Sequence, residues 1–349
     1  MYTSIKFALA VLAGVCMLCL GIALGSSPIN FVDTLGVIGH KVFGFALPGR
    51  VGDAELTIVW TLRLPRALLA FLSGGAFAAS GAVFQSVLKN ELASPYIVGV
   101  SAGASLGAAL VILTGAALPL VGAFTLPAAG FAAGLITVLF VTVCSMRLDQ
   151  TFSNNTIILF GMVFSLFINA VLVMLSALYR EELKSLLYWQ MGSFSLKGWF
   201  YVVLLLPFLA TGVAGIFRYT REMDILAFGD DQAKSLGVDA NAVRITLLVF
   251  SAVLTGAAVA LSGAIGFIDL ISPHAARRLV GSRHCLVIPM SFLIGASLLV
   301  AADIAARTIV SPSELPVGAL TAFIGGPFFI WVYFRKKGKS RAGRQHAGS

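Results

Sequence analysis

The chain has 349 residues, of which 58% are hydrophobic and 11% are charged, and its formal net charge is +9. Soluble domains carry about 25% charged residues, so this composition excludes a soluble globular protein and indicates a membrane protein. The cations lie in short segments between long apolar runs, which makes nucleic-acid binding a poor explanation of the positive charge. The cysteines are scattered and fit neither a disulfide framework nor a metal site, so we expect apolar packing positions for Cys16, Cys19, Cys144 and Cys285.

Charge-free windows long enough to cross a bilayer, for which about 20 residues are needed, recur along the whole chain. They occupy residues 7–32, 67–88, 92–146, 150–179, 198–217, 245–268, 285–302 and 315–334. We split the longest window into two helices near Pro119 and Pro127, and a shorter apolar element at 264–280 adds one more span. Helices satisfy all their backbone groups within lipid. The sequence therefore predicts an all-α integral membrane protein with ten transmembrane helices.

We expect one transmembrane domain over residues 1–349, with 5–335 embedded in the membrane. The first window is long enough to cross and is followed by further spans, which favours an uncleaved first helix over a cleaved signal peptide. Lys and Arg are about twice as frequent in the loops that become cytoplasmic when the N-terminus is inside. Both termini are therefore predicted to be cytoplasmic, in a multi-pass protein of the inner (cytoplasmic) membrane. The loop 218–244 and the basic tail 335–349 are then also cytoplasmic.

Small residues recur at every fourth position on two of the predicted helices, which places each set on one helical face. Small side chains let helix backbones approach closely in a bilayer, where no hydrophobic force drives helices together. Tight packing of a bundle explains this pattern by itself, and a lumen that suits a bulky cargo is a second interpretation. The two sets are Gly74, Ala78 and Ala82, and Gly99, Gly103 and Gly107.

Ionisable residues at membrane depth are few, and such residues commonly mark functional sites. Asp303 and Arg307 lie four residues apart on one predicted helix, so we expect them to pair. Asp269 also falls inside a predicted span. No chain of acidic or histidine residues threads the predicted spans, which disfavours a carrier driven by a proton or sodium gradient.

Eight short motifs follow one another in a fixed order and together are highly specific. They are "RLPR" at 63–66, "SGAVFQ" at 80–85, "NELASPYIVGVSAGA" at 90–104, "YWQMGS" at 188–193, "GDDQAKSLGV" at 229–238, "GAIGFIDLISPHAARRLVG" at 263–281, "ADIAAR" at 302–307 and "ELPVGALTAFIGGPFFIW" at 314–331. Over residues 5–335 the chain resembles the permease subunit family of bacterial ABC importers for iron-siderophore complexes, haem and cobalamin, the FecCD type of type II importer.

The resemblance implies the type II importer permease fold and a dimer with a second copy or a close paralogue. It also implies two ATPase subunits, which would bind ATP and Mg, and a periplasmic or lipid-anchored solute-binding protein. This chain itself would be no enzyme and would hold no cofactor. We expect an iron chelate as cargo, with haem and cobalamin left open. The alternatives are a gradient-driven secondary transporter and an ABC permease for free zinc or manganese.

The resemblance assigns a coupling role to part of the loop 218–244. Asp231, Ala233 and Gly237 match the spacing of the E-A-A-x-x-x-G segment through which ABC permeases contact their ATPases. A small alanine face and a glycine turn would permit close docking. Without the resemblance, the segment reads as an ordinary amphipathic loop helix.

Three arginines are assigned to docking of the binding protein, because similar permeases place cations there opposite acidic residues of both lobes. They are Arg63, Arg66 and Arg307. A guanidinium group suits bidentate pairing with a carboxylate. We expect these side chains at the outer water interface rather than among packed helices. The alternative is that they only anchor the topology against lipid headgroups.

Asn90 and Leu92 match the cytoplasmic gate of the family. The chain departs from the family pattern at Glu91, where proline is usual, so the gate loop is expected to be less rigid. A second departure is Asp269, where glycine is usual. This acid is expected either to pair with Arg277 or Arg278 or to mark a local specialisation.

Overall fold

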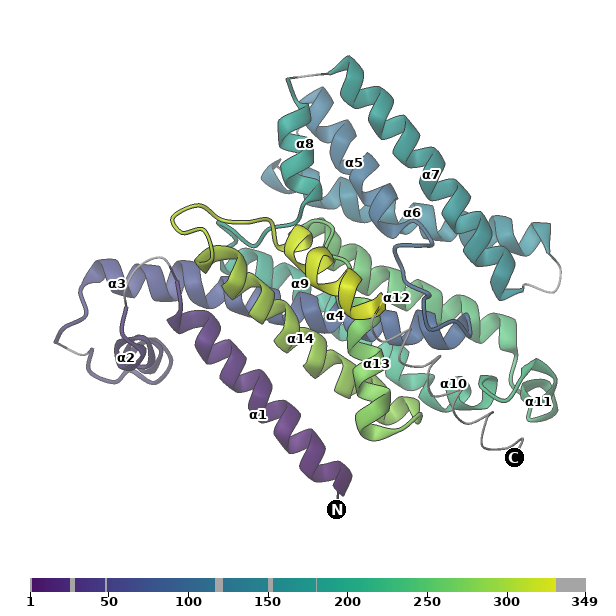
Figure 1. Ribbon diagram of the computed structural model, residues 1–349, viewed down its shortest axis with the longest axis horizontal. Coiled ribbons are helices and arrows are strands. Elements are labelled where there is room, and N and C mark those ends of the chain that lie inside the picture. Colours follow the sequence, from purple (N-terminus) through teal and green to yellow (C-terminus); the bar gives the residue numbers. More distant parts are fainter. Residues whose placement is uncertain are drawn as a thin grey trace, which may run out of the picture.

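A computed structural model describes residues 2–25, 29–47, 49–116, 122–149, 153–179 and 181–330, and the described part of the chain is built from helices without strands (Figure 1). The predicted basic tail 335–349 lies outside these residues. The helices are α1 (Tyr2–Ala23), α2 (Phe31–Phe43), α3 (Asp53–Thr57), η1 (Ile58–Arg63), α4 (Leu64–Val87), α5 (Val100–Thr114), η2 (Gly122–Phe124), α6 (Thr125–Leu148), α7 (Asn154–Leu178), α8 (Leu183–Gln190), α9 (Trp199–Arg218), α10 (Thr220–Leu226), α11 (Asp230–Ser235), α12 (Ala240–Ser262), α13 (Ile268–Val280), α14 (His284–Thr308) and Val317–Ile330.

Seven helices are long and apolar enough to cross a membrane: α1, the continuous helix from α3 to α4, α6, α7, α9, α12 and α14. Each coincides with one of the charge-free windows, which confirms an all-α membrane protein. The number of ten spans stays a prediction, because α5, α13 and Val317–Ile330 are shorter than the length that a spanning helix ordinarily needs.

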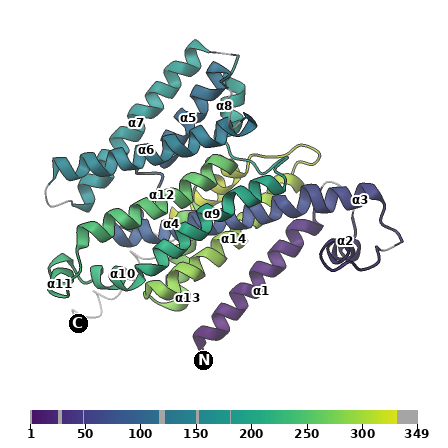
Figure 2. The same cartoon turned by 180° about the vertical axis from the view of Figure 1, so that it is seen from behind.

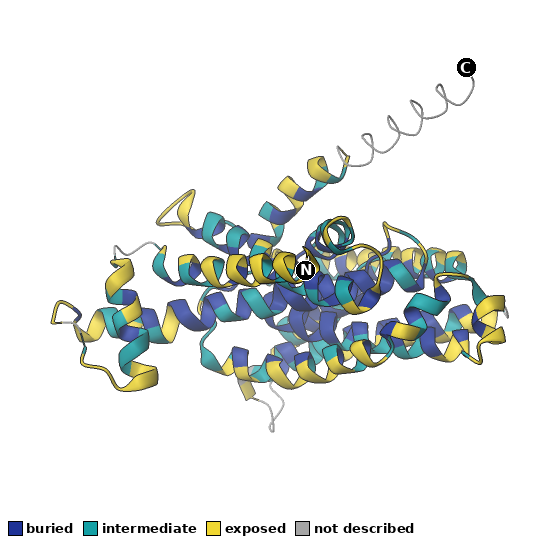
Figure 3. Cartoon of the chain, turned by 90° about the horizontal axis from the view of Figure 1, so that it is seen from below, coloured by how far each residue is buried: buried dark blue, intermediate teal, exposed yellow. Residues whose placement is uncertain are grey.

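Helix α4 is the central element of the bundle. In the continuous helix from α3 to α4, 83% of the apolar 18-residue window is buried inside the protein, whereas the corresponding window of α1 is 17% buried. Buried residues accordingly gather along the middle of the molecule and exposed ones on its periphery (Figure 3). Helices α5 to α8 form a group along one side of the layer that holds α4, α9, α12 and α14, and α1 covers the opposite side (Figures 1 and 2).

The bundle has two distinct ends. Helices α2 and α3 lie at one end, together with the loop 309–316 that follows α14, and we call this the arginine end because the three arginines of interest lie there. Helices α10 and α11 lie at the opposite end, which we call the α11 end (Figure 1). Two helices that begin at the α11 end are capped by side chains. The Ser153 side chain accepts a hydrogen bond from the Thr156 amide at the start of α7, and the Asp239 side chain accepts hydrogen bonds from the first amides of α12.

The predicted close packing of small residues is confirmed. A Cβ atom on Gly74 of α4 would lie 2.4 Å from the carbonyl oxygen of Gly295 on α14, and one on Gly107 of α5 would lie 2.4 Å from the carbonyl oxygen of Ala129 on α6. Both distances are far shorter than a carbon atom tolerates. The glycines therefore allow backbone contact between helices of this chain.

We expect Gly74→Ala to weaken the contact between α4 and α14, because the added methyl group must push the two backbones apart. Overpacking of this kind costs about 1–3 kcal/mol, which is measured as a lower melting temperature of the purified protein in detergent. Gly130→Ala is the matched control, since a Cβ atom at that helical glycine would approach no atom closer than 3.5 Å. An equal loss of stability in the two variants would contradict this account.

Candidate functional site

At the arginine end, one guanidinium group holds two carboxylates. Arg66, in the first turn of α4, donates from Nε and Nη2 to Asp303 Oδ1 of α14 at 3.0 and 2.9 Å. Its Nη1 donates to Glu314 Oε1 at 2.7 Å, and its Nη2 to Glu314 Oε2 at 3.1 Å. Charge-assisted bidentate bonds fix orientation as well as adding stability. Arg66 thus ties α4 to α14 and to the loop 309–316.

The other two arginines attach α1 to the same cluster. Arg307 Nε lies 3.5 Å from Asp303 Oδ2, which confirms the predicted pair, and Arg307 also donates to the carbonyl of Gly21. Arg63 donates from Nη1 to the carbonyls of Ala23 and Ile22 at 2.9 and 3.4 Å. These carbonyls end α1, where a cation is favoured by the helix dipole.

The expectation that these arginines project into water at the outer surface is wrong. Arg63, Arg66 and Arg307 are between 4% and 9% exposed, and carboxylates and helix-end carbonyls of the chain itself contact their guanidinium groups. A buried charge is tolerated only with such partners. The three side chains nevertheless line an open pocket of about 340 Å³ together with Glu314 and the exposed Leu196. The docking role therefore stays a prediction.

Glu314 lies in a loop outside the membrane-spanning helices. Partial burial alone would raise its pKa, but the hydrogen bonds and the charge of Arg66 outweigh that effect and lower the pKa. The pairing therefore contributes stability above the ordinary pKa of glutamate, about 4.3. That contribution is lost as the pH falls through the lower pKa of the folded state.

At the α11 end, the structure separates the three predicted coupling residues. Ala233 is fully buried within the chain, whereas Asp231 and Gly237 are exposed. Gly237 closes α11 with a φ of +76°, a left-handed conformation in which glycine is favoured. The segment thus has one residue that holds it to the bundle and two that face outward.

Asp230, the neighbour of the predicted coupling residue Asp231, holds this segment to the bundle. Arg244 Nη2 donates to Asp230 Oδ1 at 2.6 Å, and Lys89 Nζ lies 3.4 Å from the same oxygen. Partial burial raises the pKa of Asp230, but the hydrogen bond and charge of Arg244, with a smaller contribution from Lys89, lower it overall. The contact joins α11 to α12 and to the loop after α4.

Two large apolar side chains flank α11 without cover. Phe228 is 76% exposed and Leu236 is 68% exposed. They lie at the end of the bundle, next to the charged residues Asp230 and Lys234, rather than on its apolar sides. Exposed apolar groups rimmed by polar residues mark interaction surfaces.

The predicted gate residues form a turn in the loop 88–99. Asn90 Oδ1 accepts from the Leu92 amide at 2.9 Å, and the Asn90 carbonyl accepts from the Ala93 amide at 3.0 Å. Leu92 itself is 45% exposed. A polar cavity of about 580 Å³ adjoins this turn and is also lined by Glu91 and Arg277.

A chain of polar side chains in the same cavity was not anticipated from the sequence. His284 Nδ1 lies 2.5 Å from Asp224 Oδ1, and its Nε2 lies 2.6 Å from Ser86 Oγ. These contacts join α10, α14 and α4. The residues are 60 and 198 positions apart in sequence, so no local pattern could have linked them.

Of the two alternatives for Asp269, the pairing with Arg277 or Arg278 is wrong. Asp269 is 1% exposed, and its Oδ2 accepts from Ser94 Oγ in the loop 88–99. Arg277 instead donates to Gln85 Oε1 of α4. The acid therefore belongs to the contact between the gate loop and the start of α13.

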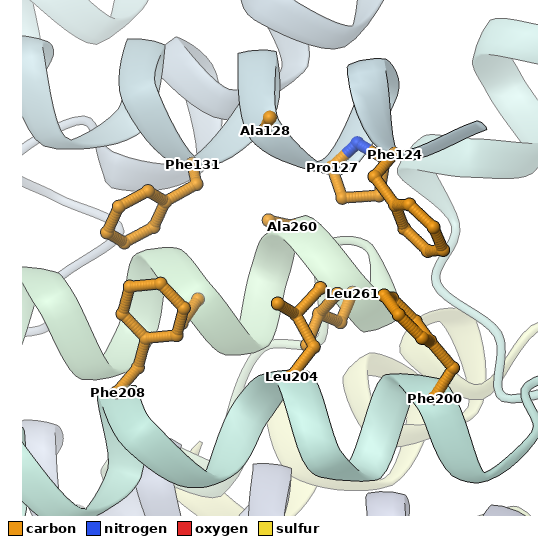
Figure 4. A pocket seen from close by; sticks show the side chains of 10 residues that line it. Phe124, Pro127, Ala128, Phe131, Phe200, Leu204, Phe208, Ala260 and Leu261 are labelled. Carbon is orange, nitrogen blue, oxygen red and sulfur yellow. The ribbon is translucent and has the colours of Figure 1, made fainter. Parts of the chain in front are cut away.

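An apolar groove of about 320 Å³ runs between α6, α9 and α12 (Figure 4). Phe131 and Phe124 line one wall and Phe208 and Phe200 the other. Its lining has no polar side chain that could orient a polar ligand. Within the described residues, no group of three or more His, Cys, Asp or Glu side chains is arranged to hold a metal ion.

The motif order, the helical architecture and the two polar ends together match a known class of transporter. The model of the FecCD transport family matches residues 11–335. The chain belongs to this family. It is 40% identical over 320 residues to the uncharacterized ABC transporter permease protein YvrB of Bacillus subtilis, covering 91% of this chain and 90% of that protein.

Other members of the FecCD family are named for several cargoes. The chain is 39% identical over 290 residues to the cobalamin import system permease protein BtuC of Halobacterium salinarum, covering 82% of this chain and 77% of that protein. Further relatives are named for import of iron citrate, hemin and iron hydroxamate. A solved structure, described as an inward-facing metal-chelate type ABC transporter, superposes with a TM-score of 0.82 at 28% identity, covering 96% of this chain and all of that one.

We expect Asp303→Ala to destabilise this FecCD-family chain strongly, because Arg66 and Arg307 would remain buried without their shared carboxylate. Removal of one partner from a buried pair costs about 3–5 kcal/mol, which is read as a lower melting temperature in detergent. Glu314→Ala is the matched control and should cost clearly less, since the Glu314 side chain is 36% exposed. Replacing Asp303 and Arg66 together by Met should recover part of the loss. Equal melting temperatures for Asp303→Ala and the unmodified protein would refute the role of this pair.

Proposed function

We propose that this chain is the membrane permease of an ATP-driven importer that carries a bulky metal chelate into the cytoplasm by alternating access. A ferric siderophore is the favoured cargo, and haem or cobalamin is the next. The observation that carries the proposal is the family match, which extends over residues 11–335. Relatives named for iron citrate, hemin and cobalamin permeases, and a solved metal-chelate transporter, support the cargo class.

In this proposal the arginine end faces outward and receives the cargo-loaded binding protein. Three guanidinium groups, those of Arg63, Arg66 and Arg307, line this pocket with one carboxylate, that of Glu314, and Asp303 pairs with Arg66 and Arg307, so positive charge is in excess. An acidic side chain of the binding protein would enter the pocket of about 340 Å³ and meet the arginines that line it. The exposed Leu196 at the pocket rim would supply apolar contact.

The α11 end faces the cytoplasm in this proposal, as do both termini, and each protomer of a permease dimer contacts one ATPase there. Phe228 and Leu236 would enter the ATPase surface, while Asp231 and Gly237 lie at the contact. Ala233 would act from inside, by packing α11 against the bundle. ATP and Mg would be bound by the ATPase, and the gate at Asn90 and Leu92 would open in response to its movement.

The function is tested by reconstituting the chain in proteoliposomes with the ATPase and the binding protein encoded beside it. We expect uptake of one chelate among ferric siderophores, hemin and cobalamin, only with internal ATP and binding protein. Uptake driven by an ion gradient without ATP would favour a secondary transporter. ATP-dependent uptake of free zinc or manganese, with none of the chelates carried, would favour the metal-ion alternative.

Leu236→Glu should prevent the permease from retaining its ATPase, because a carboxylate would replace an apolar contact at the interface. A central apolar contact is worth about tenfold or more in affinity, which is measured by co-purification. Leu196→Glu, at the arginine end, is the matched control and should retain the ATPase but lose binding-protein docking. Substitution of Gly237 is a less specific test, because any side chain there would also strain the left-handed backbone. If Leu236→Glu retains the ATPase fully, α11 is not the docking surface.

A further inference from the structure

Polar side chains gather where the gate loop 88–99 meets the start of α13. Ser94 and Tyr96 come from the loop, and Asp269 and the backbone of Ile265 come from the segment that leads into α13. These residues are separated by about 170 positions in sequence, yet they form two adjoining contacts. Buried polar groups are costly unless they are hydrogen-bonded, so the contacts require an explanation.

The first contact is the hydrogen bond that Ser94 Oγ donates to Asp269 Oδ2. Asp269 lies in the first turn of α13, where free backbone amides favour a carboxylate. The side chain is 1% exposed, and burial of a carboxylate is costly unless hydrogen bonds satisfy it. Ser94 is 4% exposed, so water does not compete for this bond.

The second contact pairs Tyr96 with one backbone unit. Tyr96 Oη donates to the Ile265 carbonyl at 2.8 Å and accepts from the Ile265 amide at 3.2 Å. The loop at Ser94 and Tyr96 is thus attached at two points to the segment 265–269. Each point alone would permit rotation about it, whereas two fix the orientation of the loop.

Helix α4 supports the same segment from the other side. A Cβ atom at Gly81 would lie 2.0 Å from the carbonyl oxygen of Asp269, so the start of α13 rests directly on α4. Gln85 Nε2 donates to the carbonyls of Asp269 and Leu270 at 3.4 Å each. The Gln85 oxygen accepts from Arg277, about two helical turns further along α13. The position of Asp269 is therefore determined on both sides.

We propose that Asp269 is a positioning residue that clamps the gate loop to the start of α13, so that loop and helix move as one unit. The inference rests on the proposed function, because it concerns how movement at the α11 end reaches the gate. Without the Asp269 contact, only Tyr96 would attach the loop to this segment, and the loop could rotate about that point when α13 moves.

The clamp is tested by hydrogen exchange on the permease–ATPase complex in lipid nanodiscs, with no cargo. The reporters are the loop amides of Ala93, Ile97 and Gly99, which bond within the loop. In Asp269→Ala and in Ser94→Ala we expect exchange about tenfold faster than in the unmodified complex, as for loss of a buried hydrogen bond. The double variant should match the single ones, because both remove the same contact.

A matched control removes a buried hydroxyl elsewhere. Ser291 is buried and bonds only to the Val287 carbonyl of its own helix, so Ser291→Ala should leave loop exchange unchanged. Asp269→Asn keeps an oxygen acceptor for Ser94 and should restore most of the protection. If Asp269→Ala fails to fold, Ser94→Ala alone serves as the test.

A second readout separates positioning from simple stability. In proteoliposomes with binding protein and a carried chelate, Asp269→Ala should hydrolyse ATP at close to the unmodified rate while chelate uptake per ATP falls about tenfold. Unchanged loop exchange in both single variants overturns the clamp, and so does faster exchange with unchanged uptake per ATP. Absence of ATP-dependent uptake in the unmodified complex would instead overturn the proposed function, and loop exchange would then decide the clamp alone.

Discussion

The register between α4 and α14 is the constraint on which both ends of the molecule depend. It is fixed at three levels: Arg66 binds Asp303 at the arginine end, Gly74 meets Gly295 in the middle, and Ser86 contacts His284 at the α11 end. The middle contact involves backbone atoms and permits no sliding. Each polar contact requires that both helices keep the same relative position, because hydrogen bonds weaken steeply with distance and angle. A shift between these helices would therefore disturb both candidate sites at once.

Burial of the arginines changes how the cation cluster at the arginine end can bind a partner. Held by Asp303, Glu314 and the last carbonyls of α1, the three guanidinium groups are fixed before any partner arrives. Such preorganisation lowers the ordering cost of binding. An acidic partner group that reaches the pocket would meet donors already oriented, in surroundings where charge is less screened than at an open surface. This arrangement fixes the orientation of a bound partner better than mobile surface arginines would.

The sequence predicted the helices well because lipid imposes a requirement on each residue of a span, and that requirement is visible as missing charge. It predicted the Gly74 and Gly107 contacts for a similar reason, since small residues at helical spacing have few other uses. It left the role of Asp269 open, because its partner Ser94 is 175 positions away. It did not single out Asp230, because a spacing pattern cannot show which of two adjacent acids contacts Arg244. It also placed the arginines in water, because carbonyl partners such as that of Ala23 leave no mark in a sequence.

The two ends differ in how their charges are held, and the difference suits a device driven from one end. At the arginine end, Arg66, Arg307 and Asp303 are buried, so their separation would expose desolvated charge and cost several kcal/mol. At the α11 end, the carboxylates of Asp230 and Asp224 are each 38% exposed, so water reaches these acids although their partners Arg244 and His284 are buried. In the proposed function, movement applied at α11 would reach these partly hydrated contacts first, while the fully buried cluster at the arginine end keeps its geometry. Polar clamps such as Asp269 and Ser94, buried yet close to the α11 end, then decide which segments follow that movement.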